Sequence, residues 1–513
     1  MASPQEKLAA SLERLEAFQD KGQRVLRFDE LKRADRERLV RSGFLREIVK
    51  GWLHVSSPDA SPGDTTFWFA SFWEFCARYC STRFGDEWHV SPEQSLLLFA
   101  ENTAIPKQIV IYTPRGMNNS LDLPFSTSLY DLKQKEMPAE SNLSEWDGLR
   151  LFSKNAALLR VSAAFFASHP VEGRVLLSGI RDASEMLVRL LDGGHSVSAG
   201  RLAGAFRRIG RMDLADDILR AMKAAGHDVR ETDPFCPEQA FEPISRTETP
   251  MVGRLKAMWQ AGREPVLARF PSPPGLPRDK KAYLESVDGI YQSDAYHSLS
   301  IEGYRVTPDL IRRVRSGGWN PDAHAEDRRN RDALAARGYW QAFRLVRQTV
   351  EEIVKGGNPG GLVRAAHREW YVELFQPCAV AGLIAASDLA GYRNDAVYLR
   401  GSRHVPPRRE VLGEAMSALF DLLEEETEPS VRATLGHWLF GYIHPYPDGN
   451  GRMARFIMNA MLASGGYPWT VIRVEDRGSY LAALEASSVG QDIDPFARFI
   501  AAQVGRSLED VSW

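Results

Sequence analysis

Hydrophobic residues recur at helical spacing along much of the chain. Near the N-terminus, Leu8, Leu12 and Leu15 lie three or four positions apart, which predicts an amphipathic helix. The apolar run 108–112 is rich in β-branched residues and predicts a strand. Helical spacing then dominates residues 281–513. The pattern predicts a mainly α-helical protein whose first half also contains β-structure.

Changes in composition indicate where one domain ends and the next begins. Nine prolines between residues 231 and 280 predict a linker. The segments expected are a winged-helix domain at 1–56, an α+β region at 57–150, a helical region at 151–230, a proline-rich linker at 231–280 and a helical domain at 281–513. Several domains are also what a length of 513 residues favours.

The first segment has the order of short helices and apolar runs that suits a winged helix. Two short apolar runs flank Gly51, where a hairpin turn is expected. Residues 21–56 hold ten basic residues against five acidic ones, which is a modest footprint for contact with phosphates. The same charges suit a solvated helical face on a small scaffold, so DNA binding and a purely structural role both stay open.

Composition argues against several other classes of protein. The net charge of −3 disfavours a basic coat for nucleic acid and a polybasic membrane anchor. None of the four cysteines forms a CxxC pair, so neither a structural zinc site nor a disulfide scaffold is expected. The most apolar stretch, 156–167, is short and carries Arg160 in its middle, so no membrane span is expected. These features predict a soluble cytoplasmic protein.

Residues 444–455 read HPYPDGNGRMAR and combine a tight loop with the start of a helix. Pro445 prevents the apolar helix before it from continuing. Gly449 and Gly451 permit backbone conformations that expose successive N–H groups. The loop then leads into a helix, whose N-terminus favours an anion. The segment is therefore expected to bind a phosphate group.

Four side chains in this segment add chemistry to the anion site. His444 titrates near neutrality and can act as a general base. Asp448 offers a carboxylate oxygen to Mg²⁺. Arg452 and Arg455 are three residues apart, so both can face one ligand. A base, a metal ligand and two arginines are the equipment for displacement at a phosphorus atom.

The segment resembles the Fic signature HPFxxGNGRxxR at every defined position except Tyr446, which replaces a phenylalanine and keeps its aromatic ring. The resemblance covers roughly residues 283–505 and implies an α-helical Fic core. It also implies a protein adenylyltransferase, which uses ATP and Mg²⁺ to attach AMP to a Ser, Thr or Tyr hydroxyl of a target protein.

The resemblance assigns roles to individual residues. They are His444 as general base, Asp448 as the ligand of a Mg²⁺ ion between the α- and β-phosphates, and Gly449, Asn450, Gly451, Arg452 and Arg455 as the nucleotide cradle. Within that cradle, Arg452 is expected near the β-phosphate and Arg455 near the γ-phosphate.

A second pattern precedes this segment. The sequence SLSIEG, which begins at Ser298, resembles the inhibitory pattern [S/T]xxxE[G/N] found ahead of many Fic domains. Ser298 and Glu302 would share one face of a helix near 290–303, and Gly303 would end that helix. The resemblance implies that Glu302 pairs with Arg455 and inhibits the enzyme in cis. A further hypothesis is that Glu302, once released, orients water to remove AMP from a modified target.

Residues 391–407 look like the small β-hairpin flap of the Fic family, which aligns a target segment by strand pairing. Val397, Tyr398 and Leu399 are the docking residues that this resemblance implies. An ordinary hairpin without a docking role would give the same pattern.

Two functions stay open from the sequence. The first is protein adenylylation, with self-modification and a homodimer left open. The second is a DNA-binding transcriptional regulator or toxin–antitoxin-like protein, in which the Fic half senses or modifies a partner. It is based on a resemblance of residues 1–56 to the winged-helix antitoxins of bacterial abortive-infection systems, carried by Leu39, Gly43, Leu45 and the run 50–52.

Overall fold

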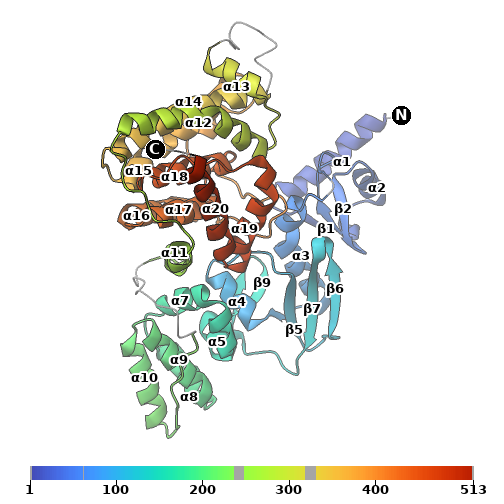
Figure 1. Cartoon of the computed structure of the whole chain (residues 1–513). Helices are drawn as coiled ribbons and strands as arrows, with labels where there is room; N and C mark the ends of the chain where they lie inside the picture. The colour runs from blue at the N-terminus through green and yellow to red at the C-terminus, as the bar shows by residue number, and fades with distance from the viewer. Residues whose placement is uncertain (1–2, 62, 236–247, 318–330, 511–513) are drawn as a thin grey trace. The chain divides into compact units, whose positions relative to one another are not determined.

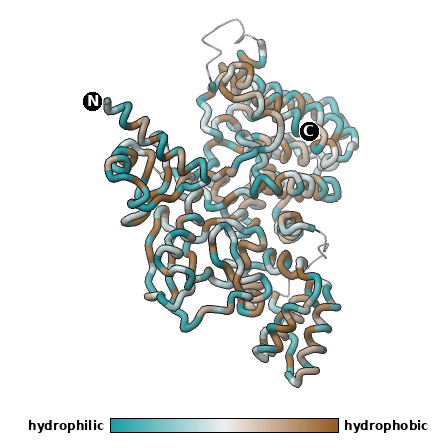
Figure 2. The backbone as a smooth tube through the Cα atoms, turned by 180° about the vertical axis from the view of Figure 1, so that it is seen from behind, coloured by the Kyte–Doolittle hydropathy of each residue, from teal (hydrophilic) through white to brown (hydrophobic). Residues whose placement is uncertain are grey.

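The computed structural model describes residues 3–61, 63–235, 248–317 and 331–510. The chain divides into two compact units, residues 1–250 with 398–405 and residues 251–397 with 406–513. As predicted, the protein is mainly α-helical, and the three sheets found among the described residues are small and lie in the first unit (Figure 1). Hydrophobic and hydrophilic residues recur in turn along the helices of both units (Figure 2). No helix in the described ranges is long and apolar enough to cross a membrane.

The first unit begins with a three-stranded sheet and two helices. Its elements are α1 (Pro4–Gln19), β1 (Val25–Arg27), the short 3₁₀ helix η1 (Phe28–Glu30), α2 (Arg33–Arg41), β2 (Leu45–Val49) and β3 (Trp52–Val55). The strands are antiparallel in the order β1-β3-β2, with Val25 opposite His54 and Leu45 opposite Val55. Gly51 has a φ of 92°, a conformation that glycine adopts without strain, in the turn between β2 and β3.

An α+β region follows. Its elements are α3 (Thr66–Phe84), β4 (His89–Val90), α4 (Pro92–Phe99), β5 (Gln108–Thr113), β6 (Asn119–Leu123), η2 (Pro124–Ser126), β7 (Thr127–Lys133), η3 (Glu140–Asn142), β8 (Leu143–Trp146) and β9 (Leu149–Phe152). Four strands form a sheet in the order β4-β5-β7-β6, in which β5 and β7 are parallel. The aromatic residues of α3, among them Trp68, Phe72 and Phe75, are buried in the same core as this sheet.

Helices complete the first unit. They are α5 (Lys154–Arg160), α6 (Ala163–Ser168), α7 (Pro170–Ser178), α8 (Ser184–Asp192), α9 (Ser196–Arg208) and α10 (Met212–Ala224). Their apolar faces form a second core, which includes Leu202, Phe206 and Ile218 and also takes in Leu96 of α4 and Phe152 of β9.

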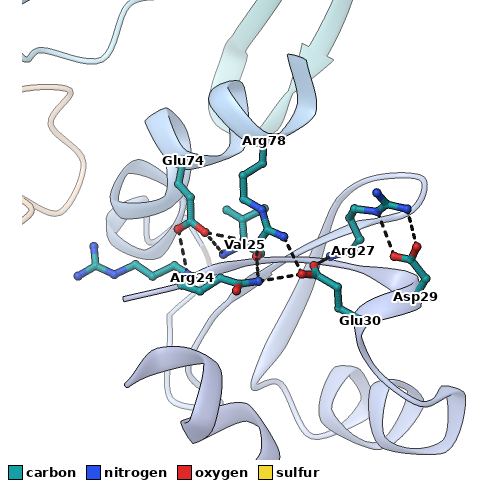
Figure 3. A network of polar contacts seen from close by, with 8 residues as sticks. Arg24, Val25, Arg27, Asp29, Glu30, Glu74 and Arg78 are labelled. Carbon is teal, nitrogen blue, oxygen red and sulfur yellow. Dashed lines mark hydrogen bonds and ion pairs between the residues drawn. The ribbon is translucent and has the colours of Figure 1, made fainter. Parts of the chain in front are cut away.

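A polar network joins β1 to α3 within the first unit (Figure 3). Glu74 accepts hydrogen bonds from the backbone N–H groups of Arg24 and Val25, at 2.9 and 3.1 Å. Arg78, one turn further along α3, donates to Glu30 at 2.7 Å and to the carbonyl oxygen of Val25. Half-buried hydrogen bonds therefore cross the domain boundary expected after residue 56.

The second unit is built from helices. They are α11 (Pro250–Leu267), α12 (Lys280–Ile301), α13 (Pro308–Arg315), α14 (Arg331–Val354), α15 (Pro359–Val380), η5 (Ala386–Leu389), η6 (Arg409–Val411), α16 (Leu412–Glu425), α17 (Pro429–Ile443), α18 (Asn450–Ala463), η7 (Val474–Asp476), α19 (Arg477–Gly490) and α20 (Asp494–Asp510). Helices α17 and α18 are almost wholly buried and pack against each other.

Helix α11 occupies part of the stretch expected to be a linker. A Cβ atom on Gly262 would lie 2.7 Å from the side chain of Leu435, so α11 packs closely against α17. The buried Arg254 donates from Nε to the hydroxyl of Tyr442 at 2.9 Å. The prolines do not prevent this helix, because Pro250 stands in its first turn, where no N–H partner is needed, and Pro265 stands near its end.

Candidate active site

The loop between α17 and α18 begins and ends with a left-handed residue. His444 ends α17 with φ 52° and ψ 57°, and Pro445 follows it. Gly449 precedes α18 with φ 80°, and a Cβ atom there would come 2.6 Å from the ring of Phe375. Position 449 therefore needs glycine both for its conformation and for space. A left-handed residue other than glycine, such as His444, is uncommon and is found often at functional sites.

The Asn450 side chain closes this loop. Its Oδ1 accepts a hydrogen bond from the N–H of Tyr446 at 2.9 Å, and its Nδ2 donates to the carbonyl oxygen of the same residue at 2.8 Å. Tyr446 is buried, and its ring stacks on that of Tyr371 with centroids 3.7 Å apart. The amide of Asn450 thus holds the loop in shape, and its contact with a nucleotide stays a prediction.

His444 has the tautomer and the charge state of a general base. Its Nδ1 lies 3.3 Å from the carbonyl oxygen of Gly441, which can only accept, so Nδ1 carries the proton and Nε2 keeps its lone pair. Burial lowers the pKa of His444 to about 4, so its imidazole is neutral at pH 7. A neutral ring with an unprotonated Nε2 can accept a proton from a substrate.

Arg393 holds the backbone of this histidine, a role that the sequence did not reveal. Its N–H donates to the carbonyl oxygen of Pro445 at 2.8 Å, and its Nε donates to that of His444 at 2.8 Å. A third bond runs from its Nη1 to the carbonyl oxygen of Asp395 at 2.7 Å. The one signal in the sequence was its place within the stretch that resembles a flap.

Arg452 is buried but has unused donors. Its guanidinium lies between the rings of Tyr304 and Phe375, 5.2 and 4.8 Å from their centroids. Its Nε and Nη2 make no hydrogen bond to any described residue, and the carboxylate of Asp448 is 3.4 Å from Nη2. Buried donors are nearly always satisfied in native proteins, so this guanidinium is poised for an anionic ligand.

Arg455 meets the residues of the inhibitory pattern. Its Nε donates to Ser298 Oγ at 2.9 Å, and its Nη2 donates to the Ser298 carbonyl at 3.1 Å and to Glu302 Oε1 at 2.7 Å. Its Nη1 has no hydrogen-bond partner among the described residues. Gly303, with φ 88°, follows the end of α12. The structure therefore brings together Ser298, Glu302 and Arg455, as the sequence predicted.

Glu302 occupies the anion cradle of the loop. A Cβ atom on Gly451 would lie 2.3 Å from Oε1 of Glu302, so glycine leaves the room that this carboxylate fills. Burial would raise the pKa of Glu302, but the charges of Arg455 and Arg452 hold it below its ordinary value. An ionised carboxylate thus lies where the loop and the helix start favour an anion.

Asp448 fits the expected role of a Mg²⁺ ligand. Its side chain is 55% exposed, and its Oδ1 accepts a hydrogen bond from the N–H of Gly449 at 2.6 Å. The described residues contain no cluster of three or more His, Cys, Asp or Glu side chains that could hold a metal ion. In nucleotide sites Mg²⁺ is commonly held by one or two carboxylates together with substrate phosphates, so a single Asp448 suffices.

The stretch expected to form the flap is a loop. No strand is assigned between α15 and α16, where Val397, Tyr398 and Leu399 lie. Residues 398–405 belong to the first unit, in which the carbonyl oxygen of Arg403 accepts a hydrogen bond from the N–H of Ile105 at 2.9 Å. Because backbone groups of this stretch bond to another part of the chain, they do not pair across a hairpin. Target docking by residues 397–399 stays a prediction.

Comparison with known proteins relates this site to a family. The model of the Fic/DOC family matches residues 362–462, which include the whole loop and both arginines. The protein adenylyltransferase Fic of Nematostella vectensis is 31% identical over 244 residues, covering 47% of this chain and 52% of that protein. The protein of the same name from Drosophila willistoni is 30% identical over 241 residues, covering 46% of this chain and 42% of that one. The chain thus spans about half the length of the curated relatives it matches.

A solved structure of Fic-1 from C. elegans is more distant. It is 17% identical, has a TM-score of 0.37 and covers 66% of this chain and 96% of that one, a likeness too remote to carry an argument. The family match and the two relatives, together with the geometry of the loop, lead to one conclusion. Residues 362–462 match the Fic/DOC family, and over about half of its length the chain is related to the protein adenylyltransferases named Fic.

Proposed function

We propose that this protein transfers AMP from ATP to a Ser, Thr or Tyr hydroxyl of a target protein. The observation that supports this best is the pair of buried arginines at the start of α18, whose unused N–H donors lie on the same loop and helix as a neutral imidazole. The relatives are named for the same reaction. Arginine donors in a desolvated site suit the charges of a triphosphate.

In the proposed reaction the hydroxyl oxygen of the target attacks the α-phosphorus of ATP. The bond from that phosphorus to the bridging oxygen breaks, and pyrophosphate leaves. Nε2 of His444 accepts the proton of the hydroxyl group. Arg452 and Arg455 stabilise the charges of the β- and γ-phosphates through their unused donors. Asp448 would hold Mg²⁺, which neutralises phosphate charge when bound.

ATP labelled in its α-phosphate tests the proposal in a Glu302→Gly background. His444→Ala should lower protein labelling by about 10²–10⁴-fold, the range over which a general base contributes. His227→Ala, at a histidine of the first unit, is the matched control and should label like the parent. Equal labelling by the parent and His444→Ala would refute the assignment of the base.

Glu302 is proposed to inhibit the transfer in cis. Its carboxylate holds Nη2 of Arg455 and fills the space beside Gly451, so the phosphates of ATP meet a negative charge in their own cradle. Glu302→Gly should therefore raise self-labelling about tenfold or more. Glu285→Gly, at an exposed position of the same helix, should not change it. Unchanged self-labelling in Glu302→Gly would remove the inhibitory role.

Removal of AMP by the same site is a related proposal. Burial lowers the pKa of His444, but Glu302 acts in the opposite direction, so its carboxylate lies within electrostatic reach of the base. Once released from Arg455, Glu302 is placed to orient a water molecule toward a modified hydroxyl. Wild type should release AMP from a labelled target, and Glu302→Gln should not. Absence of release by the wild type would contradict this proposal.

The second candidate function is DNA binding by residues 1–56. Helix α2 lies between β1 and β2 in the chain, and the strand order β1-β3-β2 with a β2–β3 turn is the arrangement of a winged helix. Lys32, Arg33 and Arg41 are exposed on or beside α2, and Lys50 is exposed in the turn. These positions suit contact with phosphates.

A mobility-shift assay at several fixed salt concentrations tests this second candidate. Binding that weakens steeply with salt, and that a combined Arg41→Ala and Lys50→Ala variant loses, would support it. An unshifted band at low salt would exclude it.

A further inference from the structure

Asp294 is a buried carboxyl group on the face of α12 that carries the inhibitory pattern. It precedes Ser298 by four residues and Glu302 by eight, so the three side chains form one stripe on the helix. Asp294 is only 3% exposed, and within the described ranges it forms no ion pair. A carboxyl group in such a place is costly unless hydrogen bonds compensate for the lost water.

A chain of hydroxyl groups links Asp294 to Arg455. The hydroxyl of Tyr339 donates to Asp294 Oδ2 at 2.6 Å. Ser298 lies four residues after Asp294 on the same face of α12, and its side chain acts to lower the pKa of the Tyr339 phenol. Ser298 Oγ in turn accepts from Nε of Arg455 at 2.9 Å. Hydrogen bonds thus connect Arg455 with Ser298 and Tyr339 with Asp294, and Ser298 and Asp294 share one helix face.

Two carboxyl groups thus act on Arg455, Glu302 by direct contact and Asp294 through intervening hydroxyl groups. Glu302 contacts Nη2 directly and its side chain is 26% exposed, so an anionic ligand can replace it. Asp294 is enclosed by the helices and acts through two hydroxyl groups, so it stays in place when the ligand changes. Burial raises the pKa of Asp294 to about 6, while the Tyr339 hydrogen bond and the charge of Arg455 act to lower it.

We propose that Asp294, Tyr339 and Ser298 form a fixed anchor that positions Arg455 for a phosphate, whereas Glu302 is its exchangeable partner. The proposal rests on the proposed function in that the phosphate is the γ-phosphate of ATP. It gives the two polar residues of the inhibitory pattern different roles: Ser298 serves the anchor and Glu302 the inhibition. Their substitutions should therefore act in opposite directions.

Chemical modification tests the anchor without any nucleotide. Phenylglyoxal reacts with accessible arginines, and mass spectrometry reports its rate at Arg455. In Glu302→Gly this rate should stay low, because the anchor remains. Adding Asp294→Asn or Tyr339→Phe should raise it about tenfold, the effect of losing one hydrogen bond in a charged network. An unchanged rate in both double variants would overturn the anchor.

Two controls keep this measurement specific. Asp288 is on the same helix and pairs with Arg347. Asp288→Asn should therefore leave the rate at which phenylglyoxal modifies Arg455 unchanged. Tyr339→Phe keeps the ring that packs against Phe456 and loses only the hydroxyl, so it remains informative if Asp294→Asn folds poorly. Circular dichroism establishes that each variant is folded.

ATP binding then separates the anchor from the proposed function. In the Glu302→Gly background, Ser298→Ala should weaken ATP binding in calorimetry and raise the KM for ATP, each about tenfold, with a smaller change in kcat. Ser298→Thr keeps the hydroxyl and should restore both values.

In the wild-type background, Ser298→Ala should not raise self-labelling, and a rise equal to that of Glu302→Gly would overturn the assignment of Ser298. If the Glu302→Gly parent binds no ATP while Arg455 modification behaves as expected, the proposed function fails and the anchor stands.

Discussion

Arg78 of the first unit serves the fold, whereas Arg452 of the second unit is available to a ligand. Arg78 uses its terminal nitrogens on Glu30 and on the carbonyl oxygen of Val25, and so fastens α3 to β1 (Figure 3). Arg452 is buried, yet its Nε and Nη2 have no hydrogen-bond partner among the described residues. An arginine whose donors are satisfied stabilises the fold, whereas one with unused donors is ready to bind an anion.

Burial alone does not separate these two uses. Arg393 is 4% exposed and Arg455 is 3% exposed, and both lie in the second unit. The donors of Arg393 end on carbonyl oxygens around His444, while Nη1 of Arg455 remains without a partner in the described part of the chain. Of these two buried arginines, only Arg455 has an unused donor within the described structure, at Nη1, and that donor rather than its burial distinguishes it from Arg393.

Among the arginines compared, the largest effect should follow from Arg452→Ala in the Glu302→Gly background. Labelling from ATP should fall by about 10²–10³-fold, the usual loss when one donor to a reacting phosphate or oxyanion is removed. The midpoint of thermal unfolding should fall too, because the ion pair with Asp448 and the ring contacts with Tyr304 and Phe375 are lost, but the loss of labelling per folded molecule should remain. Arg452→Lys keeps the charge but not the planar fork and should recover only part of the activity. A large fall in the unfolding midpoint, with normal labelling by the folded fraction, would reverse the assignment.

The site was predicted from sequence where its parts are neighbours in the chain. Loop, base, metal ligand and arginines all lie within residues 444–455, so their spacing alone defines the geometry. The contact of Glu302 with this segment was predicted although the two are far apart in the sequence, because Glu302 belongs to a recognisable pattern of its own. Asp294 and Tyr339 belong to no pattern and meet through packing of α12 on α14, 45 residues apart, so spacing could not reveal them.

Two local expectations differ from the described structure for a related reason. The hairpin over residues 391–407 was expected from local sequence, but backbone groups of this stretch bond to partners near Ile105, far away in the chain. The linker was expected from proline content, yet residues 250–267 form a helix whose Gly262 packs on Leu435. Long-range packing decided both outcomes, and composition carries no record of it.

The next effect in size concerns Arg78, the structural arginine of the comparison. Arg78→Ala should lower the free energy of unfolding by about 2–4 kcal/mol, because it leaves Glu30 and the Val25 carbonyl with fewer partners. Labelling per folded molecule should not change. Urea unfolding and a labelling assay on the same sample measure both quantities. Loss of labelling without loss of stability would break the comparison.

Histidines extend the comparison to pH. Burial lowers the pKa of His54 in the first unit and of His444 in the second, each to about 4. Both are neutral in the folded protein while an unfolded chain would protonate near pH 6.5, so stability is complete above pH 6.5 and is lost as pH falls toward 4. The labelling rate should vary less than about threefold between pH 5.5 and 8, because the base stays unprotonated. A rate that halves near pH 6.5 would show an ordinary imidazole instead.

The smallest effect should come from Arg24→Ala, within the same network as Arg78. The backbone N–H of Arg24 is held by Glu74 at 2.9 Å and survives the substitution. Its guanidinium makes two hydrogen bonds of 3.3 Å, to the carbonyl oxygen of Ala70 and the hydroxyl of Tyr398, and lies 5.7 Å from the ring of Tyr398. Long, half-exposed contacts of this kind contribute less than about 1 kcal/mol to the free energy of unfolding.

Urea unfolding of Arg24→Ala and of Glu74→Ala, measured side by side, tests this expectation. The free energy of unfolding should fall slightly in Arg24→Ala and further in Glu74→Ala, because only the second change removes the partner of two backbone N–H groups. Equal losses would mean that the side chain of Arg24 contributes as much as the Glu74 carboxylate to holding β1 against α3.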